Sequence, residues 1–499
     1  MAESAVPLST WDQIAPRQYI RQVYCFPYQP AQCGALQPLY NALRVALDRT
    51  CVELPDFAGK VGLEGKPGHL AILKQAHDEP VLEVVDHSKT FPFDYAELKA
   101  KGFPAQAFVG PSFDLEHSWT DRSKIPVVKV HARIISGGLM LCVYVHHSTT
   151  DGMGMNNFMS RFARYTLLPD YSVYHLRDAS IKKHFELPDD ITSAPTDQNS
   201  FEHLMEQCPE YWIAPKYSGP LTFNFSPSEV PFESITKEGR IFVFNADSIE
   251  LLKETATKYH PLIDNDVYIR PSTFACLTAL TWVSVIISRR EVAQTVSMEK
   301  SARLLLNASW ARRAFTKLIH DSTSNTNANG NTVAMVNLQV ELSNLVTARL
   351  SQEVTPATGR AFAKVVHLIE VALASITDDF VATRTAMIRA APDPRMIGVD
   401  HDPLDPHDFI INSWRHLGAD TRWNLPGVIG DEEARDADGS VCPDAVRRAQ
   451  PVWNMSAGLI LPGRQCSKKY EILVTLDAMS MAKLCSDQCW MTWVDRVVE

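Results

Sequence analysis

The sequence has no excess of positive charge and no long uninterrupted hydrophobic run. Its 48 lysines and arginines are outnumbered by 58 aspartates and glutamates, which gives a net charge of −10 over 499 residues. A nucleic acid or an anionic membrane would select a basic face, so we expect neither as a partner, although a local basic pocket for an anionic cosubstrate remains compatible with this charge. The longest uncharged apolar stretch, residues 271–288, is shorter than the ~20 residues that span a bilayer. We predict a buried helix there.

The sequence also lacks a recognisable targeting signal and paired cysteine motifs. The first residues are not a basic segment followed by an apolar run, so we predict no signal peptide and a cytoplasmic protein. The ten cysteines have no regular spacing, which favours reduced, buried thiols over a disulfide framework. Cys485 and Cys489, the closest pair, have no second pair or nearby histidines for a zinc site, and we expect them on a buried helix face.

Length and composition indicate a large folded protein, and the interspersed strand and helix patterns indicate the α/β or α+β class. Hydrophobic residues make up 45% and charged residues 21% of the chain, and a chain of this length is expected to form two domains. A segment rich in Pro, Ser, Asn and Tyr at residues 194–225 predicts a crossover linker. We therefore expect an N-terminal domain at 1–193 and a C-terminal domain at 226–499.

Hydrophobic patterns predict a strand, a turn and a helix around a pair of histidines. Residues 128–133 and 139–145 have the pattern of two strands joined at Gly137-Gly138, and the second is an almost unbroken apolar run typical of a central strand. Residues 153–168 have helical periodicity. His146 and His147 would lie between them, where side chains can face a cleft. Further helices are predicted at 36–49 and 479–490, a strand at 470–476, and loops at 321–332 and 393–408.

The segment from His146 to Gly152 contains the residues that acyl transfer from a thioester requires. A histidine can remove the proton of an attacking hydroxyl because its pKa lies near working pH. A thioester is already activated, so no nucleophilic serine is needed, and the sequence has no Gly-x-Ser-x-Gly motif. We expect a tight turn in which Asp151 forms a buried ion pair, Gly152 adopts a conformation that other residues resist, and Thr150 or Asp151 caps the following helix.

Structural and metal-binding roles are the alternatives for these histidines. A histidine at a strand end can be a satisfied structural residue, and two histidines with an aspartate could bind zinc. Adjacent histidines on an extended chain point to opposite faces, which disfavours a shared metal. A second group of possible ligands comprises His401, Asp402, Asp405, His407 and Asp408. Acidic loops with prolines are usually solvated, so we expect no metal at either place.

The pattern His-His-x-x-x-Asp-Gly at residues 146–152 resembles the signature of the CoA-dependent acyltransferase superfamily. From end to end the chain resembles its BAHD-type members, in particular fungal trichothecene 3-O-acetyltransferase-like proteins. The stretches that carry this resemblance, besides the signature, are residues 8–12, 54–61, 272–282, 470–474 and 481–484, with Pro462.

The resemblance implies roles for individual residues. His147 would be the general base and His146 a supporting residue, while Asp151 and Gly152 would shape the turn. The arginine that pairs with Asp151 would be Arg312 or Arg313, in the segment 307–313. The second family motif is degraded here: Asp420 would be its aspartate, and the preceding segment 412–415 contains Trp414, which, like a backbone amide, is a candidate oxyanion donor.

The resemblance also implies a fold and an activity. The fold would consist of two similar chloramphenicol-acetyltransferase-like α/β domains, each a mixed sheet with flanking helices, with a tunnel between them. A monomer without a permanently bound cofactor would transfer an acyl group, such as acetyl, from acyl-CoA to a hydroxyl of a secondary metabolite, in a ternary complex and without an acyl-enzyme. The alternatives are a condensation-type domain that takes its acyl group from a carrier protein, and a non-catalytic metabolite-binding homologue.

Overall fold

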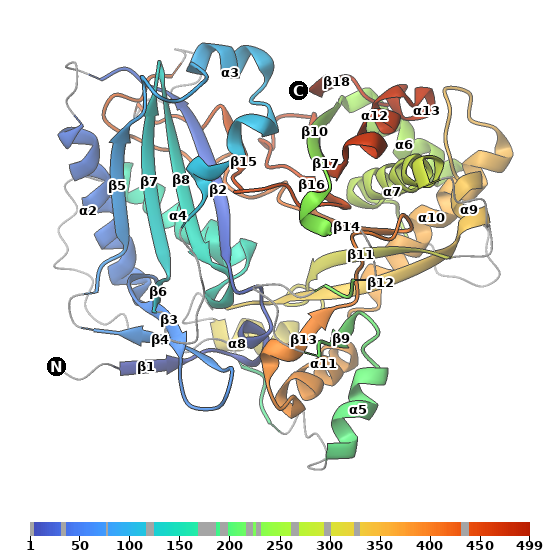
Figure 1. Ribbon diagram of the computed structural model, residues 1–499, viewed down its shortest axis with the longest axis horizontal. Coiled ribbons are helices and arrows are strands. Elements are labelled where there is room, and N and C mark those ends of the chain that lie inside the picture. The colour runs from blue at the N-terminus through green and yellow to red at the C-terminus, as the bar shows by residue number, and fades with distance from the viewer. Residues whose placement is uncertain are drawn as a thin grey trace.

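The computed structural model describes residues 4–30, 36–75, 78–115, 124–167, 186–189, 198–215, 223–225, 231–260, 269–293, 301–323, 330–430 and 439–499. Two parts lie side by side, each built on a mixed β-sheet with helices against it (Figure 1). Most of the first part comes from residues 4–167, and most of the second comes from residues 198–499. None of the described helices is both long and apolar enough to cross a membrane.

The first part contains a five-stranded sheet in the order β15-β2-β8-β7-β5. Only the β5–β7 pair is parallel. A second sheet has the order β1-β4-β3-β6, and α2 packs on α4 behind the larger sheet. The strands are β1 (Ser4–Pro7), β2 (Tyr19–Pro27), β3 (Lys60–Leu63), β4 (Leu70–Lys74), β5 (Val81–Asp86), β6 (Ile125–Pro126), β7 (Val128–Ile135), β8 (Gly138–His146) and β15 (Ala445–Arg448). The helices are α1 (Thr10–Gln13), α2 (Gln37–Glu53), α3 (Tyr95–Lys101) and α4 (Gly152–Leu167).

The second part contains a seven-stranded sheet in the order β12-β11-β14-β16-β17-β10-β18 and a small β13-β9 sheet. The strands are β9 (Tyr211–Ile213), β10 (Lys237–Phe244), β11 (Ser301–Ser309), β12 (Val333–Glu341), β13 (Ile397–Val399), β14 (Asp408–Ser413), β16 (Ala457–Ile460), β17 (Tyr470–Asp477) and β18 (Arg496–Val498). The helices are α5 (Gln198–Glu206), α6 (Ala246–Lys258), α7 (Thr273–Ala293), α8 (Thr316–Thr323), α9 (Leu342–Thr347), α10 (Pro356–Ala374), α11 (Asp378–Ala390), α12 (Ala478–Ser486) and α13 (Gln488–Met491). Short 3₁₀ helices are η1 (Pro55–Ala58), η2 (Ala105–Phe108), η3 (Pro111–Phe113), η4 (His147–Thr149), η6 (Phe232–Ser234) and η7 (Pro394–Met396).

The predicted strand, turn and helix around the histidine pair are confirmed. Strand β8 is buried along all nine residues and lies between β2 and β7. The turn comes one residue earlier than predicted, because Ile135 pairs with Gly138 and Gly137 takes the left-handed conformation, with φ of 72°. The apolar side of α4 is buried at the expected spacing, at Met155, Phe158, Met159 and Phe162. The sheet core therefore holds the His146–His147 segment at a fixed place.

The other local predictions are confirmed in part. The predicted helices at 36–49 and 271–288 correspond to α2 and the buried α7, and the predicted strand at 470–476 corresponds to β17. The predicted helix at 479–490 is two helices, α12 and α13, because the Asp487 carboxylate accepts from the Cys489 N–H and starts a new one. Cys485 and Cys489 therefore lie on different helices. Both are half-buried. Five cysteines are buried free thiols, namely Cys25, Cys51, Cys142, Cys208 and Cys276.

The segments predicted as linker and loops contain more structure than expected. The described part of 194–225 contains α5 and β9, and β9 pairs with β13. Residues 194–197 and 216–222 lie outside the described residues. The segment 321–332 begins inside α8 and continues to the start of β12, with 324–329 outside the described residues. The segment 393–408 contains η7, β13 and the first residue of β14.

Candidate active site

A cavity of about 1660 Å³ lies between the two parts of the molecule and receives residues from both. Strand β2 and the start of α4 line it from the first part. Strands β11, β12, β14 and β16 line it from the second part. His147, Trp414 and Asn331 are among its lining residues. The predicted site residues His147 and Trp414, far apart in the sequence, are therefore on the wall of one cavity.

The position of His147 is set by backbone and side-chain contacts on both sides. Its N–H donates to the carbonyl of Gln18, at 2.8 Å. Its own carbonyl accepts from the Nδ2 of Asn331, at 2.7 Å. Its Nδ1 lies 3.1 Å from the Oδ1 of the same asparagine. The imidazole is thus held by a residue from the second part of the chain, just before β12.

The contacts of Asn331 determine which nitrogen of His147 carries the proton. The Nδ2 of Asn331 also donates to Asp12 Oδ1, at 2.8 Å. A carboxylate accepts but does not donate, so the NH₂ end of the amide must face Asp12 and the oxygen must face the imidazole. Oδ1 then accepts from Nδ1–H of His147. The Nε2 of the neutral ring keeps its lone pair and can take a proton.

The surroundings of His147 favour this neutral form. Burial lowers the pKa of the imidazole, while its hydrogen bonds and the charges of Asp151 and Asp12 act in the opposite direction. The net direction is downward, so the ring is unprotonated at neutral pH. This is the form that a general base requires.

Asp12 is a fully buried carboxylate that joins α1 to the catalytic segment. Its Oδ2 accepts from the backbone N–H of Ser9 at 3.0 Å and from the Ser9 hydroxyl at 2.6 Å, in a capping box. Its Oδ1 accepts from the backbone N–H and the side chain of Asn331. In the sequence, Asp12 stands only in a family-like stretch and Asn331 in a predicted loop. The capping-box spacing from Ser9 to Asp12 marks the start of α1, but no local signal points to Asn331, its partner just before β12.

Asp151 shapes the turn through hydrogen bonds. Its Oδ1 accepts from the N–H groups of Met153 and Gly154, at 2.9 and 3.0 Å, which confirms the predicted N-cap of α4. Its Oδ2 accepts from the N–H and the hydroxyl of Thr332, at 3.0 and 2.9 Å. Asp151 and Asn331–Thr332 therefore connect the two parts of the molecule beside His147.

The predicted ion pair between Asp151 and Arg312 or Arg313 is wrong. Among the described contacts, Arg312 reaches the sulfur of Met153 at 3.6 Å, and Arg313 donates to the carbonyl of Ser309 at 2.8 Å. Four hydrogen-bond donors already satisfy the Asp151 carboxylate, so it needs no cation. Both arginines are exposed and line the cavity.

Gly152 and His146 have roles different from those expected. Gly152 is not one of the described glycines with positive φ, so the turn does not depend on its conformational freedom. A Cβ at this position would lie 3.0 Å from the Leu417 side chain, so Gly152 permits close packing. His146 is buried, its Nδ1 accepts from the Ser148 N–H at 3.3 Å, and its ring meets that of Tyr19 edge-on. His146 does not line the cavity.

The residues of the second, degraded motif and of the segment before it lie in three different places: on the cavity wall, on the surface and in the core. Trp414 lines the cavity, and its indole N–H makes no hydrogen bond to the described residues. Asp420 is exposed and accepts from the Gln465 N–H at 3.1 Å, so it connects two loops outside the cavity. Trp423 is fully buried among aromatic rings of the first part, including Tyr24 and Phe162.

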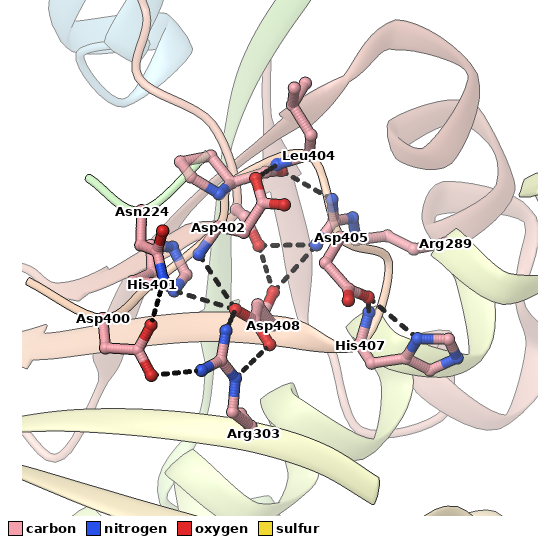
Figure 2. A network of polar contacts seen from close by, with 12 residues as sticks. Asn224, Arg289, Arg303, Asp400, His401, Asp402, Leu404, Asp405, His407 and Asp408 are labelled. Carbon is pink, nitrogen blue, oxygen red and sulfur yellow. Dashed lines mark hydrogen bonds and ion pairs between the residues drawn. The ribbon is translucent and has the colours of Figure 1, made fainter. Parts of the chain in front are cut away.

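The acidic segment 400–408 is a buried network of ion pairs (Figure 2). Arg303 pairs with Asp408 on one side and with Asp400, at 2.7 Å, on the other. Arg289 donates to the Asp408 carbonyl at 2.8 Å. His401, Asp402, His407 and Asp408 are each at most 2% exposed, so the expectation of a solvated loop is wrong. Burial, together with Arg289 and Arg303, lowers the pKa of His401 to about 3.

Arginines lie against these carboxylates. Within the described residues, no group of three or more His, Cys, Asp or Glu side chains is arranged to hold a metal ion. The two guanidinium groups supply the positive charge that buried carboxylates need. The network fixes the start of β14, which continues toward Trp414 on the cavity wall.

Most of the curated sequence relatives of this chain are named as acyltransferases or acetyltransferases, and one is named as an enoyl-CoA isomerase/hydratase. Residues 19–165 match the family model described as the trichothecene 3-O-acetyltransferase-like N-terminal domain. Acyltransferase BOA11 of Botryotinia fuckeliana is 24% identical over 160 residues, and trichothecene 8-O-acetyltransferase of Fusarium sporotrichioides is 21% identical over 474 residues, or 91% of both chains. The BOA11 match covers 31% of this chain and 34% of BOA11. Matches to two further curated acyltransferases cover 59% and 36% of those proteins, so this chain matches only part of their length.

The fold matches a solved acyltransferase over its full length. The structure of TRI101 from F. graminearum, complexed with coenzyme A and T-2 mycotoxin, superposes with a TM-score of 0.71 at 16% identity and covers 99% of this chain and 100% of its own. At this identity the match establishes the fold. The chain therefore has the two-part α/β fold of TRI101, and its residues 19–165 match the model of the trichothecene 3-O-acetyltransferase-like N-terminal domain.

Proposed function

We propose that this chain transfers an acyl group, such as acetyl, from acyl-CoA to a hydroxyl group of a secondary metabolite, with His147 as the general base. The observation that carries the proposal is the pair of hydrogen bonds from Asn331, which leaves Nε2 of a neutral His147 unprotonated on a cavity shared by both parts. The names of the relatives support the substrate class: TRI101 was solved with coenzyme A and T-2 mycotoxin, and another relative is a trichothecene 8-O-acetyltransferase.

The proposed reaction needs one base and one oxyanion donor. Nε2 of His147 removes the proton of the acceptor hydroxyl as its oxygen attacks the thioester carbonyl. The protonated imidazole then gives its proton to the CoA thiolate as the tetrahedral intermediate collapses. The acyl group passes directly to the acceptor, without an acyl-enzyme. Trp414 is the proposed oxyanion donor, because its indole lines the same cavity and its N–H is not used elsewhere in the described structure.

We also propose a cytoplasmic monomer without a permanently bound cofactor, with acyl-CoA and the alcohol as its only small-molecule partners. The domains are proposed at 1–193 and 226–499, joined by 194–225. Strand β15 belongs to the later domain in sequence, yet it pairs with β2 in the earlier one. The two domains are thus expected to interlock.

The test is release of free CoA thiol from acetyl-CoA in the presence of an alcohol panel. The variant His147→Ala should lose about 10²–10⁴-fold in rate, because it removes general-base catalysis. The variant His203→Ala is the matched control, since His203 lies on α5 with its side chain 71% exposed and away from the cavity. A His147→Ala protein that is as active as His203→Ala would exclude His147 as the base.

A further inference from the structure

Two arginines line the cavity at the edge of the five-stranded sheet. Arg21 lies on β2 and Arg448 is the last residue of the neighbouring β15, which pairs with β2 through Arg448 and Gln22. Both side chains are half-buried and both contribute to the cavity wall. They come from distant parts of the sequence. Arg448 pairs with Gln22, the neighbour of Arg21, and the cavity is what the two arginine side chains share.

Neither guanidinium has an anionic partner among the described residues. No ion pair or side-chain hydrogen bond joins Arg21 or Arg448 to a described carboxylate, and Asp114, whose charge acts on Arg21, forms no ion pair with it. Burial lowers the pKa of both arginines. That of Arg448 falls to about 10, with the nearby charge of Arg21 contributing. Two cations held close together in a partly desolvated wall are unfavourable unless an anion joins them.

Another arginine of the cavity wall shows how a guanidinium is satisfied by protein groups here. Arg415 donates to the carbonyls of Arg464 and Ser467, at 3.2 and 2.6 Å, and stacks on the ring of Tyr470 at 4.2 Å. Its role is to hold the loop after β14. Arg21 and Arg448 have no comparable contacts, so structural support does not account for them.

The polar groups next to Arg448 are also unused donors. The side-chain amide nitrogens of Gln22, its strand partner, and of Gln450, two residues further along, are buried without a hydrogen-bond partner among the described atoms. Gln450 also lines the cavity. Guanidinium and amide N–H groups can only donate, so this wall is complementary to a group whose oxygens only accept.

We propose that Arg21 and Arg448 form a subsite for an anionic oxygen group, a carboxylate or a phosphate, of a molecule that binds in the cavity. In the context of the proposed function, on which this reading rests, the group belongs either to the acyl acceptor, which would then be a hydroxy acid, or to the phosphates of CoA. Arginine is suited to both, because its planar fork binds carboxylate and phosphate oxygens in a bidentate manner.

Direct binding tests the subsite without any turnover. Inorganic phosphate and benzoate are titrated against the wild type, Arg21→Gln and Arg448→Gln, with the rise in melting temperature as the readout. The wild type should be stabilised by both anions, and each variant should need about tenfold more anion for the same rise, because a charge-assisted contact is lost. Arg360→Gln is the matched control, since Arg360 is exposed on α10 outside the cavity. Equal stabilisation of all four proteins would overturn the proposal.

Calorimetric titration with CoA and 3′-dephospho-CoA then identifies the source of the anion. If the arginine variants bind CoA more weakly than the wild type does, and their loss of affinity for 3′-dephospho-CoA is smaller than that for CoA, the subsite belongs to a CoA phosphate. Unchanged CoA binding together with lost benzoate binding assigns it to an acceptor carboxylate. The variant His147→Ala should bind phosphate, benzoate and CoA as the wild type does. If it binds them normally and the wild type lacks transferase activity, the proposed function fails while the subsite stands.

Discussion

At the scale of single residues, the amide of Asn331 sets the orientation of the His147 imidazole, which we propose as the general base. It donates to Asp12 and to the His147 carbonyl, and it accepts from the His147 ring. We expect Asn331→Ala to lower kcat by roughly 10²-fold, because the ring loses its fixed tautomer and orientation. The KM for acetyl-CoA should stay unchanged. Steady-state kinetics of Asn331→Ala check both expectations. Asn344→Ala, at an exposed residue of α9, is the control variant measured with it. A change in KM alone would indicate a binding role.

The lowered pKa of His147 predicts the pH dependence of the reaction. The base must be unprotonated, so activity is lost as pH falls through the pKa of His147 in the folded enzyme. Because burial places that pKa below the usual ~6.5, the rate should stay level from about pH 8 to about pH 6.5 and fall only in more acidic buffer. In Asp12→Asn, removal of a negative charge that raises this pKa should move the fall to lower pH. A shift toward higher pH would contradict the assigned influence of Asp12.

At the scale of elements, the turn from η4 to α4 depends on the four hydrogen bonds of Asp151. We expect Asp151→Ala to cost about 2–4 kcal/mol in the free energy of unfolding, because it removes the cap of α4 and leaves Thr332 without its partner. Asp420→Ala, at the exposed aspartate of the second motif, should cost less than about 1 kcal/mol. Urea denaturation measures both. Equal losses would mean that the cap contributes little.

Local patterns in the sequence were sufficient for the elements that surround the histidines. Strands β7 and β8 and helix α4 follow from apolar spacing, and Asp151 follows from its place before α4. The partners of these residues could not be predicted in the same way. Asn331 contacts His147 across 184 residues of sequence, and no periodicity connects a loop residue to a strand end so far away. The arginine assigned to Asp151 is wrong for the same reason, since hydrogen-bond donors of Thr332, just before β12, occupy the carboxylate.

At the scale of the whole molecule, the two parts are not independent. Strand β15 completes the sheet of the first part, and Trp423 fills the core beneath that sheet, although both follow residue 400 in the sequence. Asp12 and Asp151 of the first part accept hydrogen bonds from Asn331 and Thr332 of the second, just before β12. The cavity is therefore framed by contacts that would all be lost if the parts separated, and residues 4–167 alone would lack an edge strand and a buried tryptophan.

This interlocking predicts that the protein unfolds as one cooperative unit. Trp423 is fully buried against Tyr24, Phe26 and Phe162, so Trp423→Ala should cost about 3–5 kcal/mol through the cavity it leaves. Trp423→Phe keeps an aromatic ring in that space and should cost less. Differential scanning calorimetry should show a single transition in both variants. Its temperature should fall more in Trp423→Ala than in Trp423→Phe. Two transitions, with only one of them shifted by Trp423→Ala, would mean that the parts unfold separately and that β15 and Trp423 do not couple them.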